Sequence, residues 1–242
     1  MLYYSQTGAT KAVAECLAAK VGADIEEIEI TAPYDGNFEE TISRVIKERE
    51  GGILPELRPL NVRIEDYDVI YLGYPVWFGT YAPPVAALLE TQNFDGRKIV
   101  PFCTFGSGGI ESSSVDMASK LPGTEILQGY GVRNARIAAA PSELDYFLKA
   151  NGYVEGTVET LPEFSEQHPV TEVEVAVFEA ACGNYQMPLG TAVSTGSRTL
   201  ADGTVEYNFT VNTSSPTGEA VKGTIYVTCA QGRDPEFTRV VR

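Results

Sequence analysis

A short loop near the N-terminus contains hydroxyl and glycine residues of the kind that bind a phosphate group. In chain order it consists of Ser5, Gln6, Thr7, Gly8, Ala9 and Thr10. An apolar stretch precedes it at residues 1–4, and apolar residues at helical spacing follow over residues 10–21. The loop therefore opens a helix, where backbone N–H groups and the helix dipole favour an anion. The alternative is that the loop only makes a turn and caps the helix.

This loop differs from two common nucleotide-binding motifs. A Walker loop needs Gly-Lys-Ser/Thr after four variable residues, and the dinucleotide fingerprint is rich in glycine. Gly8 is the only glycine in this loop. The sequence therefore disfavours a nucleoside triphosphate, whereas the hydroxyls suit a phosphate monoester.

An aromatic segment follows the most apolar predicted strand, residues 67–72. In chain order it consists of Gly73, Tyr74, Pro75, Val76, Trp77, Phe78, Gly79 and Thr80. We expect a loop here, ahead of a helix that begins near Ala82. Planar side chains at the carboxyl end of a strand can face a planar ligand. The alternative is that Trp77, the only tryptophan, and Phe78 pack beneath their own loop.

A glycine-rich segment follows another predicted strand, residues 98–103. It consists of Thr104, Phe105, Gly106, Ser107, Gly108 and Gly109. Its glycines allow backbone N–H groups to approach a ligand closely, although a flexible surface loop has a similar composition. Because all three segments follow a strand and precede a helix, we expect them to meet at one edge of a parallel sheet.

Over residues 1–153 the chain resembles the flavodoxin family. The resemblance rests on Tyr-Ser-Gln-Thr-Gly-Ala-Thr at 4–10, Gly-Tyr-Pro-Val-Trp-Phe-Gly-Thr at 73–80, and Pro-Phe-Cys-Thr with the glycines after it at 101–109. It implies FMN as the cofactor, with its phosphate on the first segment and its isoalloxazine ring between the other two. The residues that the resemblance assigns to FMN are Ser5, Gln6, Thr7, Gly8, Ala9, Thr10, Pro75, Val76, Trp77, Phe78, Gly79, Thr104, Phe105, Gly106, Ser107 and Gly108.

Two features depart from the pattern of that family. Relatives usually have several apolar residues before the Tyr-Ser pair, so it is open whether Met1 is the native start. Phe105 stands where related proteins often have histidine, so we expect different hydrogen bonding near the pyrimidine edge of the flavin.

The remaining pattern predicts an α/β fold for residues 1–153. Further strands are expected at 25–30 and 125–132, and helices at 38–50, 82–89, 112–121 and 142–150. Because strands alternate with helices, a parallel sheet with helices on both faces is favoured. The resemblance implies a doubly wound five-stranded sheet of order 2-1-3-4-5.

The composition changes after about Gly152, and we predict a small α+β domain over residues 154–242. A helix is expected from 170 or 171 to about 185, with antiparallel strands at 192–199, 205–213 and 223–229. This order loosely resembles a cystatin-like module. His168 is interpreted as a linker residue, and Glu172, Glu174 and Glu179 as a solvated helix face rather than a metal site. We therefore expect a docking or scaffold role.

Charge and composition limit the classes of partner. The formal net charge of −15 disfavours nucleic acid and suits steering of a basic redox partner, although an acidic surface can serve solubility alone. The chain lacks the run of about 20 apolar residues that a membrane span needs, so we expect a cytoplasmic protein, or an exported or lipid-anchored one if the N-terminus is trimmed.

The cysteines stand singly at positions 16, 103, 182 and 229. Their spacing disfavours zinc and iron–sulfur clusters, so no metal is expected. Cys182 and Cys229 are candidates for a disulfide in an exported form, and free buried thiols are the alternative.

Two main classes of function follow from the resemblance. One is an electron carrier in which FMN cycles between redox states and a separate reductase or acceptor protein is the partner. The other is an FMN-dependent oxidoreductase that reduces a quinone with NAD(P)H. Rings at Trp77 and Phe78 leave little space for a nicotinamide, and Arg133 and Arg136 are the only nearby candidates to bind the 2′-phosphate of NADPH. A flavin-less binding module is a third alternative, because a fold does not fix a function.

Overall fold

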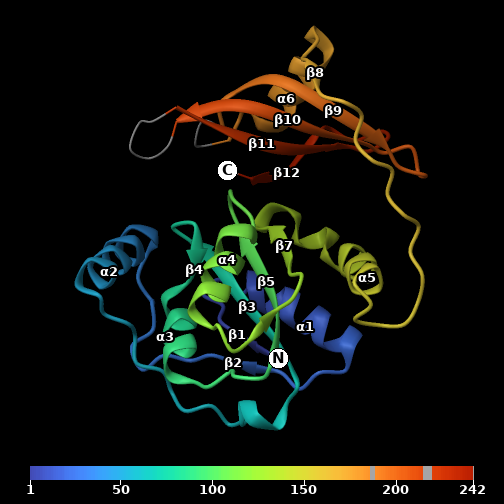
Figure 1. The fold of residues 1–242 in the computed structure, drawn as a ribbon. Helices are drawn as coiled ribbons and strands as arrows, with labels where there is room; N and C mark the ends of the chain where they lie inside the picture. The colour runs from blue at the N-terminus through green and yellow to red at the C-terminus, as the bar shows by residue number, and fades with distance from the viewer. Residues whose placement is uncertain (186–188, 215–219, 242) are drawn as a thin grey trace. The chain divides into compact units, whose positions relative to one another are not determined.

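The computed structural model describes residues 1–185, 189–214 and 220–241 (Figure 1). The chain divides into two compact units, Met1–Thr157 and Val158–Arg242. Each unit has hydrophobic core residues of its own.

The first unit is built on a parallel sheet of order β2-β1-β3-β5-β6. Its strands are β1 (Leu2–Tyr3), β2 (Glu26–Glu27), β3 (Val69–Trp77), β5 (Lys98–Phe105) and β6 (Glu125–Ile126). A short strand, β7 (Tyr130–Arg133), continues the outer position beside β5, and β4 (Thr80–Tyr81) pairs with β3 in the antiparallel sense. The predicted sheet and its strand order are confirmed.

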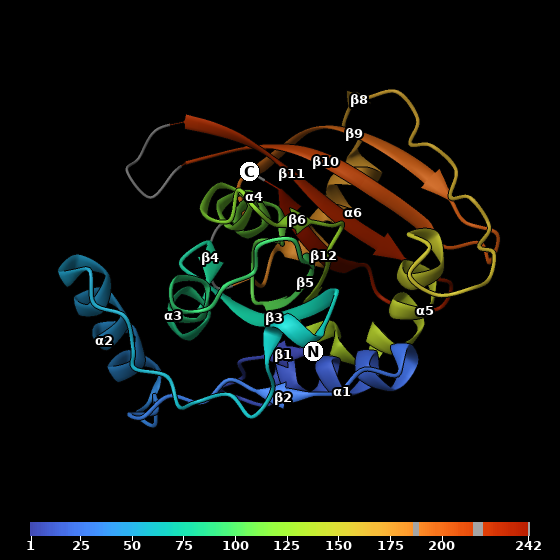
Figure 2. The same cartoon turned by 60° about the horizontal axis from the view of Figure 1, so that its bottom comes forward.

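Helices cover both faces of this sheet (Figures 1 and 2). They are α1 (Ala9–Val21), α2 (Phe38–Gly51), α3 (Pro83–Thr91), α4 (Glu111–Lys120) and α5 (Ala140–Ala150), with short 3₁₀ turns at Ile64–Asp66 and Asn134–Ala139. Apolar residues of α1 and α5 form one core cluster, whereas those of α2, α3 and α4 join a second. The two clusters lie on opposite faces of the sheet because side chains alternate along its strands.

Local signals explain where these helices begin and end. Asn37 caps α2 in a capping box with Glu40, and Gly52 ends it in the left-handed conformation. Pro83 and Pro84 occupy the first positions of α3, where a missing N–H group costs little. These signals are local in sequence, and the helix bounds accordingly agree with prediction to within two residues in α1, α2 and α4.

Some strand bounds differ from prediction. The expected strand at 25–30 is paired in the sheet only over Glu26–Glu27, and Ile30 instead forms an isolated antiparallel bridge with Leu57. The expected strand at 125–132 is interrupted and becomes β6 and β7.

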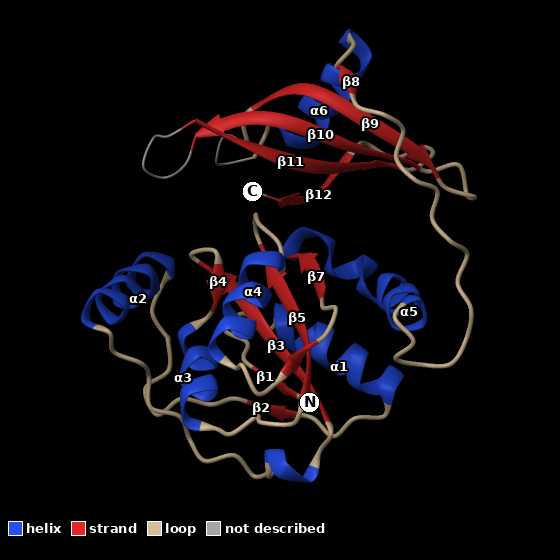
Figure 3. Cartoon of the chain, viewed as in Figure 1, coloured by secondary structure: helices blue, strands red, loops and turns tan. Residues whose placement is uncertain are grey.

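The second unit is an antiparallel sheet with a helix (Figure 3). Its elements are β8 (His168–Pro169), α6 (Glu172–Cys182), β9 (Thr191–Thr199), β10 (Val205–Ser214), β11 (Ala220–Cys229) and β12 (Glu236–Val241). Phe178 and Cys182 of α6 pack on Phe209, Val211 and other buried residues of the strands. The helix and the antiparallel sheet were predicted, whereas β8 and β12 were not, and the likeness to a cystatin-like module stays a prediction.

Three further features bear on function. All four cysteines are free thiols, so the candidate disulfide between Cys182 and Cys229 is not formed. Within the described ranges, no helix is long and apolar enough to cross a membrane. Among those same residues there is no group of three or more His, Cys, Asp or Glu side chains that could hold a metal ion.

Candidate functional site

The hydroxyl-rich loop connects β1 to α1, as predicted. Gly8 is the N-cap of α1 in the left-handed conformation, with φ of 87°, and open space surrounds the position of a Cβ there. Ser5 Oγ accepts a hydrogen bond from the N–H of Lys11 at 3.2 Å. Thr7 and Gly8 are exposed. The first turn of a helix has N–H groups without intrahelical partners, so this exposed loop presents donors to an anion.

Gln6 has a different role from its neighbours in the loop. Its amide Nε2 donates to the carbonyl oxygen of Tyr34 at 3.0 Å and to Thr41 Oγ1 at 3.1 Å. The Gln6 side chain therefore joins the loop to the segment before α2 and to α2 itself.

A buried hydrogen bond joins the first and third predicted segments. Thr10 Oγ1 lies 2.9 Å from Thr104 Oγ1, and each residue is 1 % exposed. Thr10 is in the first turn of α1 and Thr104 is near the carboxyl end of β5. The beginning of α1 is thus fixed against the end of β5.

The aromatic segment is not the loop that we expected. Residues 73–77 belong to β3, and β3 turns back into β4 with Trp77 paired to Thr80. Phe78 and Gly79 form the two-residue turn, with φ of 52° and 83°. Positive φ at both positions is typical of a type I′ hairpin, whose twist matches that of the strands. The prediction of an irregular loop is wrong because this hairpin extends the strand.

Trp77 is held edge-on by two tyrosines. Its ring centroid lies 5.9 Å from that of Tyr4 and 5.4 Å from that of Tyr34, with interplanar angles of 89° and 86°. Trp77 is half-buried, as are Pro75 and Val76. Phe78 at the tip of the hairpin is 50 % exposed and lies 5.3 Å from the guanidinium of Arg49 in α2.

The third segment is partly strand and partly loop. Thr104 and Phe105 belong to β5, and the Phe105 ring is 2 % exposed within the core. Gly106 is exposed, and its carbonyl oxygen accepts a hydrogen bond from Arg133 Nε at 3.0 Å. Ser107 and Gly108 are half-buried. The structure therefore buries the Phe105 side chain and leaves the Gly106–Gly108 backbone on the surface, and the part that Phe105 takes in binding stays a prediction.

Residues outside the predicted set also belong to this edge of the sheet. Tyr34 lies in the connection after β2, where no sequence motif marks it, and its hydroxyl donates to Glu48 of α2 at 2.5 Å. Burial raises the pKa of Tyr34 and of Tyr4 far above the ordinary tyrosine value, and the hydrogen bond to Glu48 adds to the shift at Tyr34. Both phenols therefore keep their protons to a higher pH than a solvent-exposed tyrosine does.

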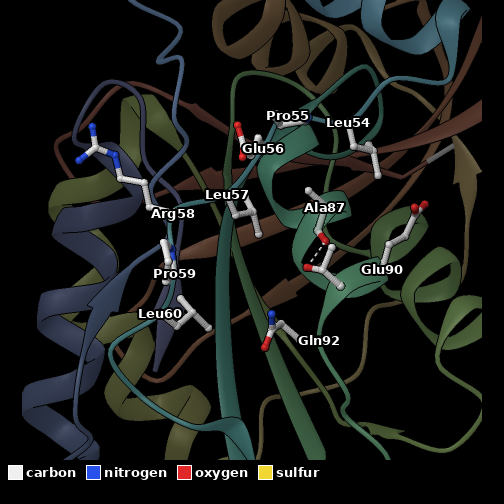
Figure 4. Close-up of a pocket in the computed structure, with 11 residues that line it drawn as sticks. Leu54, Pro55, Glu56, Leu57, Arg58, Pro59, Leu60, Ala87, Glu90 and Gln92 are labelled. Atoms are coloured by element: carbon white, nitrogen blue, oxygen red, sulfur yellow. Dashed lines mark hydrogen bonds between the residues drawn. The ribbon is translucent and has the colours of Figure 1, made fainter.

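A pocket lies elsewhere on the first unit (Figure 4). It has a volume of about 480 Å³ and is lined by residues 54–60 and by Ala87, Glu90, Thr91 and Gln92. None of the predicted site residues lines it. Its place beside α3 separates it from the hydroxyl-rich loop, so it is not part of the candidate site.

Solved structures support the fold of the first unit. A putative flavoprotein from Bacteroides eggerthii is 26 % identical, with a TM-score of 0.52, over 62 % of this chain and 95 % of that one. A flavoprotein from Lactobacillus acidophilus, determined in complex with FMN, is 25 % identical with a TM-score of 0.50. The match covers 61 % of this chain and 96 % of that one. A putative flavoprotein from Bacteroides uniformis shares the fold. It is 24 % identical with a TM-score of 0.53, over 60 % of this chain and 95 % of that one. No curated protein matches the chain.

The family comparison covers the part of the chain that contains all three segments. The family model described as Flavodoxin matches residues 1–144, which is more than half of the 242 residues. The protein therefore belongs to the flavodoxin family.

Proposed function

We propose that the first unit binds FMN and that the protein transfers electrons between partner proteins. The observation that carries this proposal is the convergence of the hydroxyl-rich loop, the β3–β4 hairpin and the end of β5 at one edge of the parallel sheet. In open α/β sheets this edge, outside the carboxyl ends of the strands, is where ligands bind. Membership of the flavodoxin family and the FMN complex of a related flavoprotein support FMN as the cofactor.

The hydroxyl-rich loop fits the phosphate end of FMN. The backbone at Gly8 and Ala9 and the hydroxyls of Ser5 and Thr7 are the exposed or half-exposed donors there. Thr10 is buried against Thr104, so in this proposal it holds the loop in place and donates at most one hydrogen bond to the phosphate. Gln6 holds the same loop from its other side through Tyr34 and Thr41.

The hairpin and the glycine-rich segment fit the ring end of FMN. Pro75, Val76, Trp77, Phe78 and Gly79 form one side in this proposal, and the backbone of Gly106, Ser107 and Gly108 forms the other. Aromatic rings and close backbone N–H groups suit a planar heterocycle with a polar edge. When bound, FMN supplies one- and two-electron chemistry, while the protein contributes binding, orientation and electrostatics.

An electron carrier agrees better with this geometry than a reductase that binds a second substrate. Trp77 is fixed edge-on by two tyrosines, and an aromatic side chain held over the flavin occupies the space that a nicotinamide needs. The net charge of −15 favours association with a partner that has a basic surface, at a rate that falls as salt is added.

The experiment that tests this function uses the full-length protein loaded with FMN and then desalted. Under anaerobic conditions, NADH or NADPH is added alone and then together with a separate flavodoxin reductase, while the flavin absorbance is recorded. We expect bleaching only when the reductase is present. Bleaching by NAD(P)H alone would instead assign the protein to the FMN-dependent oxidoreductases, and failure to retain FMN would favour a flavin-less binding module.

A further inference from the structure

Tyr34 contacts two of the three segments that converge at the candidate site. Its carbonyl oxygen accepts the hydrogen bond from Gln6 of the hydroxyl-rich loop at 3.0 Å. Its ring meets Trp77 of the hairpin edge-on at 5.4 Å. One residue, at 6 % exposure, therefore links the loop to the aromatic hairpin.

Tyr34 is itself held by two charged residues of α2. Its hydroxyl donates to Glu48, and the guanidinium of Arg44 lies 4.0 Å from its ring centroid. Arg44 Nε also donates to Glu48 at 2.8 Å, and Arg44 Nη1 donates to the carbonyl oxygen of Pro33 at 2.9 Å. The side chain of Glu48 is only 13 % exposed. The ring is thus fixed in position and in rotation, because its edge, its face and its hydroxyl each have a partner.

The contact between the Tyr34 and Trp77 rings has a favourable geometry, so Tyr34 can hold the Trp77 ring in place. Aromatic pairs prefer edge-to-face contacts with centroids about 4.5–7 Å apart, which includes the distance from Tyr34 to Trp77. A cation on one face of a tyrosine ring is favourable within about 6 Å. Trp77 is half-buried and lies next to a two-residue turn, so side chains beside it provide its lateral support. The Tyr34 and Tyr4 rings supply that support.

We propose that Tyr34 is a positioning residue for the flavin site, which fixes the Trp77 indole and the hydroxyl-rich loop before the cofactor arrives. This inference rests on the proposed function for its role in FMN binding, but its effect on Trp77 is a property of the protein without cofactor. Such preorganisation raises affinity because less conformational freedom is lost on binding. Arg44 and Glu48 act through Tyr34 and not on the ligand.

The single tryptophan makes this inference directly measurable, because all indole fluorescence comes from Trp77. The test compares cofactor-free wild type with Tyr34→Leu, which removes ring and hydroxyl, and Tyr34→Phe, which keeps the ring. The matched control is Tyr153→Leu, because Tyr153 also makes an edge-on ring contact, with Phe147 at 5.5 Å, and donates to a backbone carbonyl, that of Gln128 at 2.9 Å. Tyr153 packs with the core cluster of α1 and α5, on the other face of the sheet.

We expect Tyr34→Leu to shift the Trp77 emission to longer wavelength, to increase its quenching by acrylamide, and to raise the FMN Kd about tenfold. Tyr34→Phe is expected to retain the wild-type emission and most of the affinity, and Tyr153→Leu to leave both unchanged. If Tyr34→Leu does not fold, as judged by circular dichroism, Arg44→Leu replaces it, because this variant removes the cation from the Tyr34 ring. It is expected to change the Trp77 emission, the acrylamide quenching and the FMN Kd in the same direction, but by less.

Two results would overturn the inference. One is an unchanged Trp77 emission in Tyr34→Leu, or in Arg44→Leu where that variant replaces it. The other is a changed Trp77 emission with an unchanged FMN Kd, since the position of the indole would then have no bearing on cofactor binding. Failure of wild type to bind FMN while the emission changes as expected would contradict the proposed function and leave the placement of Trp77 by Tyr34 supported.

Discussion

The two units of this chain use their sheets in different ways. In the first unit, Thr10 of α1 and Thr104 at the end of β5 are hydrogen-bonded at 2.9 Å although 94 positions separate them in the sequence. In the second unit, β9, β10 and β11 pair in chain order, and the turn between β9 and β10 is closed locally by the N–H of Leu200 bonded to Thr204. Parallel connections bring distant segments to one edge, whereas hairpins keep neighbours together. The candidate site accordingly lies in the first unit.

A segment that precedes α6 is hydrogen-bonded along one edge of the antiparallel sheet of the second unit. The N–H of Ser165 donates to the carbonyl of Ser197 on the outer side of β9, and Gln167 Nε2 donates to the carbonyl and the side-chain oxygen of Asn208. Gly196 lets this segment lie close, because a Cβ there would be 2.5 Å from the carbonyl oxygen of Ser165. This segment, residues 165–169, therefore covers the edge of β9, which would otherwise be open to pairing with another chain.

The largest expected effect comes from a glycine that the first unit requires. A Cβ at Gly73, in the centre of β3, would lie 2.2 Å from Phe102 Cζ, and Phe102 is fully buried. We expect Gly73→Ala to lower the free energy of unfolding of the first unit by about 3 kcal/mol, as overpacking does. Gly196→Ala is the counterpart in the second unit and should displace residues 165–167 without affecting the first. Urea denaturation followed by Trp77 fluorescence measures the stability of the first unit in each variant. Equal losses of stability in Gly73→Ala and Gly196→Ala would contradict the expected difference between the two units.

A smaller effect is expected from a single hydroxyl of the loop. Thr7 is exposed, so Thr7→Val should leave the stability unchanged but weaken FMN binding by about 2 kcal/mol, or about 30-fold, because a hydrogen bond to a charged phosphate is lost. Thr191→Val, at an exposed threonine of the second unit, is the control and should not alter the Kd. Quenching of FMN fluorescence gives both values. An unaltered Kd in Thr7→Val would exclude Thr7 from phosphate binding.

Alkaline pH should separate the two units further. Burial raises the pKa of several tyrosines in the first unit above the ordinary value, namely Tyr3, Tyr4, Tyr34, Tyr71, Tyr74, Tyr81, Tyr130 and Tyr153. In the second unit burial raises the pKa of Tyr207. A phenol that keeps its proton more tightly when folded contributes stability below its unfolded pKa of about 10, and this stability is lost as the pH rises further.

We therefore expect the first unit to lose more stability than the second between about pH 8 and about pH 11. Urea denaturation at both pH values tests this, with Trp77 fluorescence for the first unit and circular dichroism for the whole chain. A parallel loss in both units would mean that the buried phenols of the first unit do not determine its alkaline stability.

The smallest effect is expected from removing the second unit. The core clusters of the first unit are made from residues 1–154, and those of the second from residues 170–240. Because each core cluster consists of residues from one unit, we expect residues 1–157 alone to fold and to bind FMN with an unchanged Kd. A fluorescence titration of the two forms in parallel measures this. Loss of binding in the short form would show that the second unit contributes to the site.

The sequence predicted those features that depend on local signals. The hydroxyl-rich loop and the parallel sheet were found because glycine, hydroxyls and alternating elements are visible in the chain itself, whereas the strand order came from the resemblance to flavodoxins. The β3–β4 hairpin was missed because phenylalanine at 78 is unusual at positive φ, where Asn-Gly is the common signal. Tyr34 was missed because its importance comes only from tertiary contacts with Gln6 and Trp77.

The missed strand β12 has a different physical reason. Its buried residues, Phe237 and Val240, are three positions apart, which does not fit the two-residue period of a strand. The pairing of β11 with β12 shifts register between Tyr226 and Val227. Such an irregularity changes which residues face the core, so the alternation that sequence reasoning relies on is lost.

The most direct test of the central claim is a titration of the full-length, cofactor-free protein with FMN and, separately, with riboflavin, which lacks the phosphate. If the hydroxyl-rich loop binds the phosphate, FMN binds with one equivalent per chain and riboflavin binds at least about 100-fold more weakly, since two or more hydrogen bonds to a charged group are absent. Equal affinities for the two flavins, or no binding of FMN, would contradict the assignment of this loop.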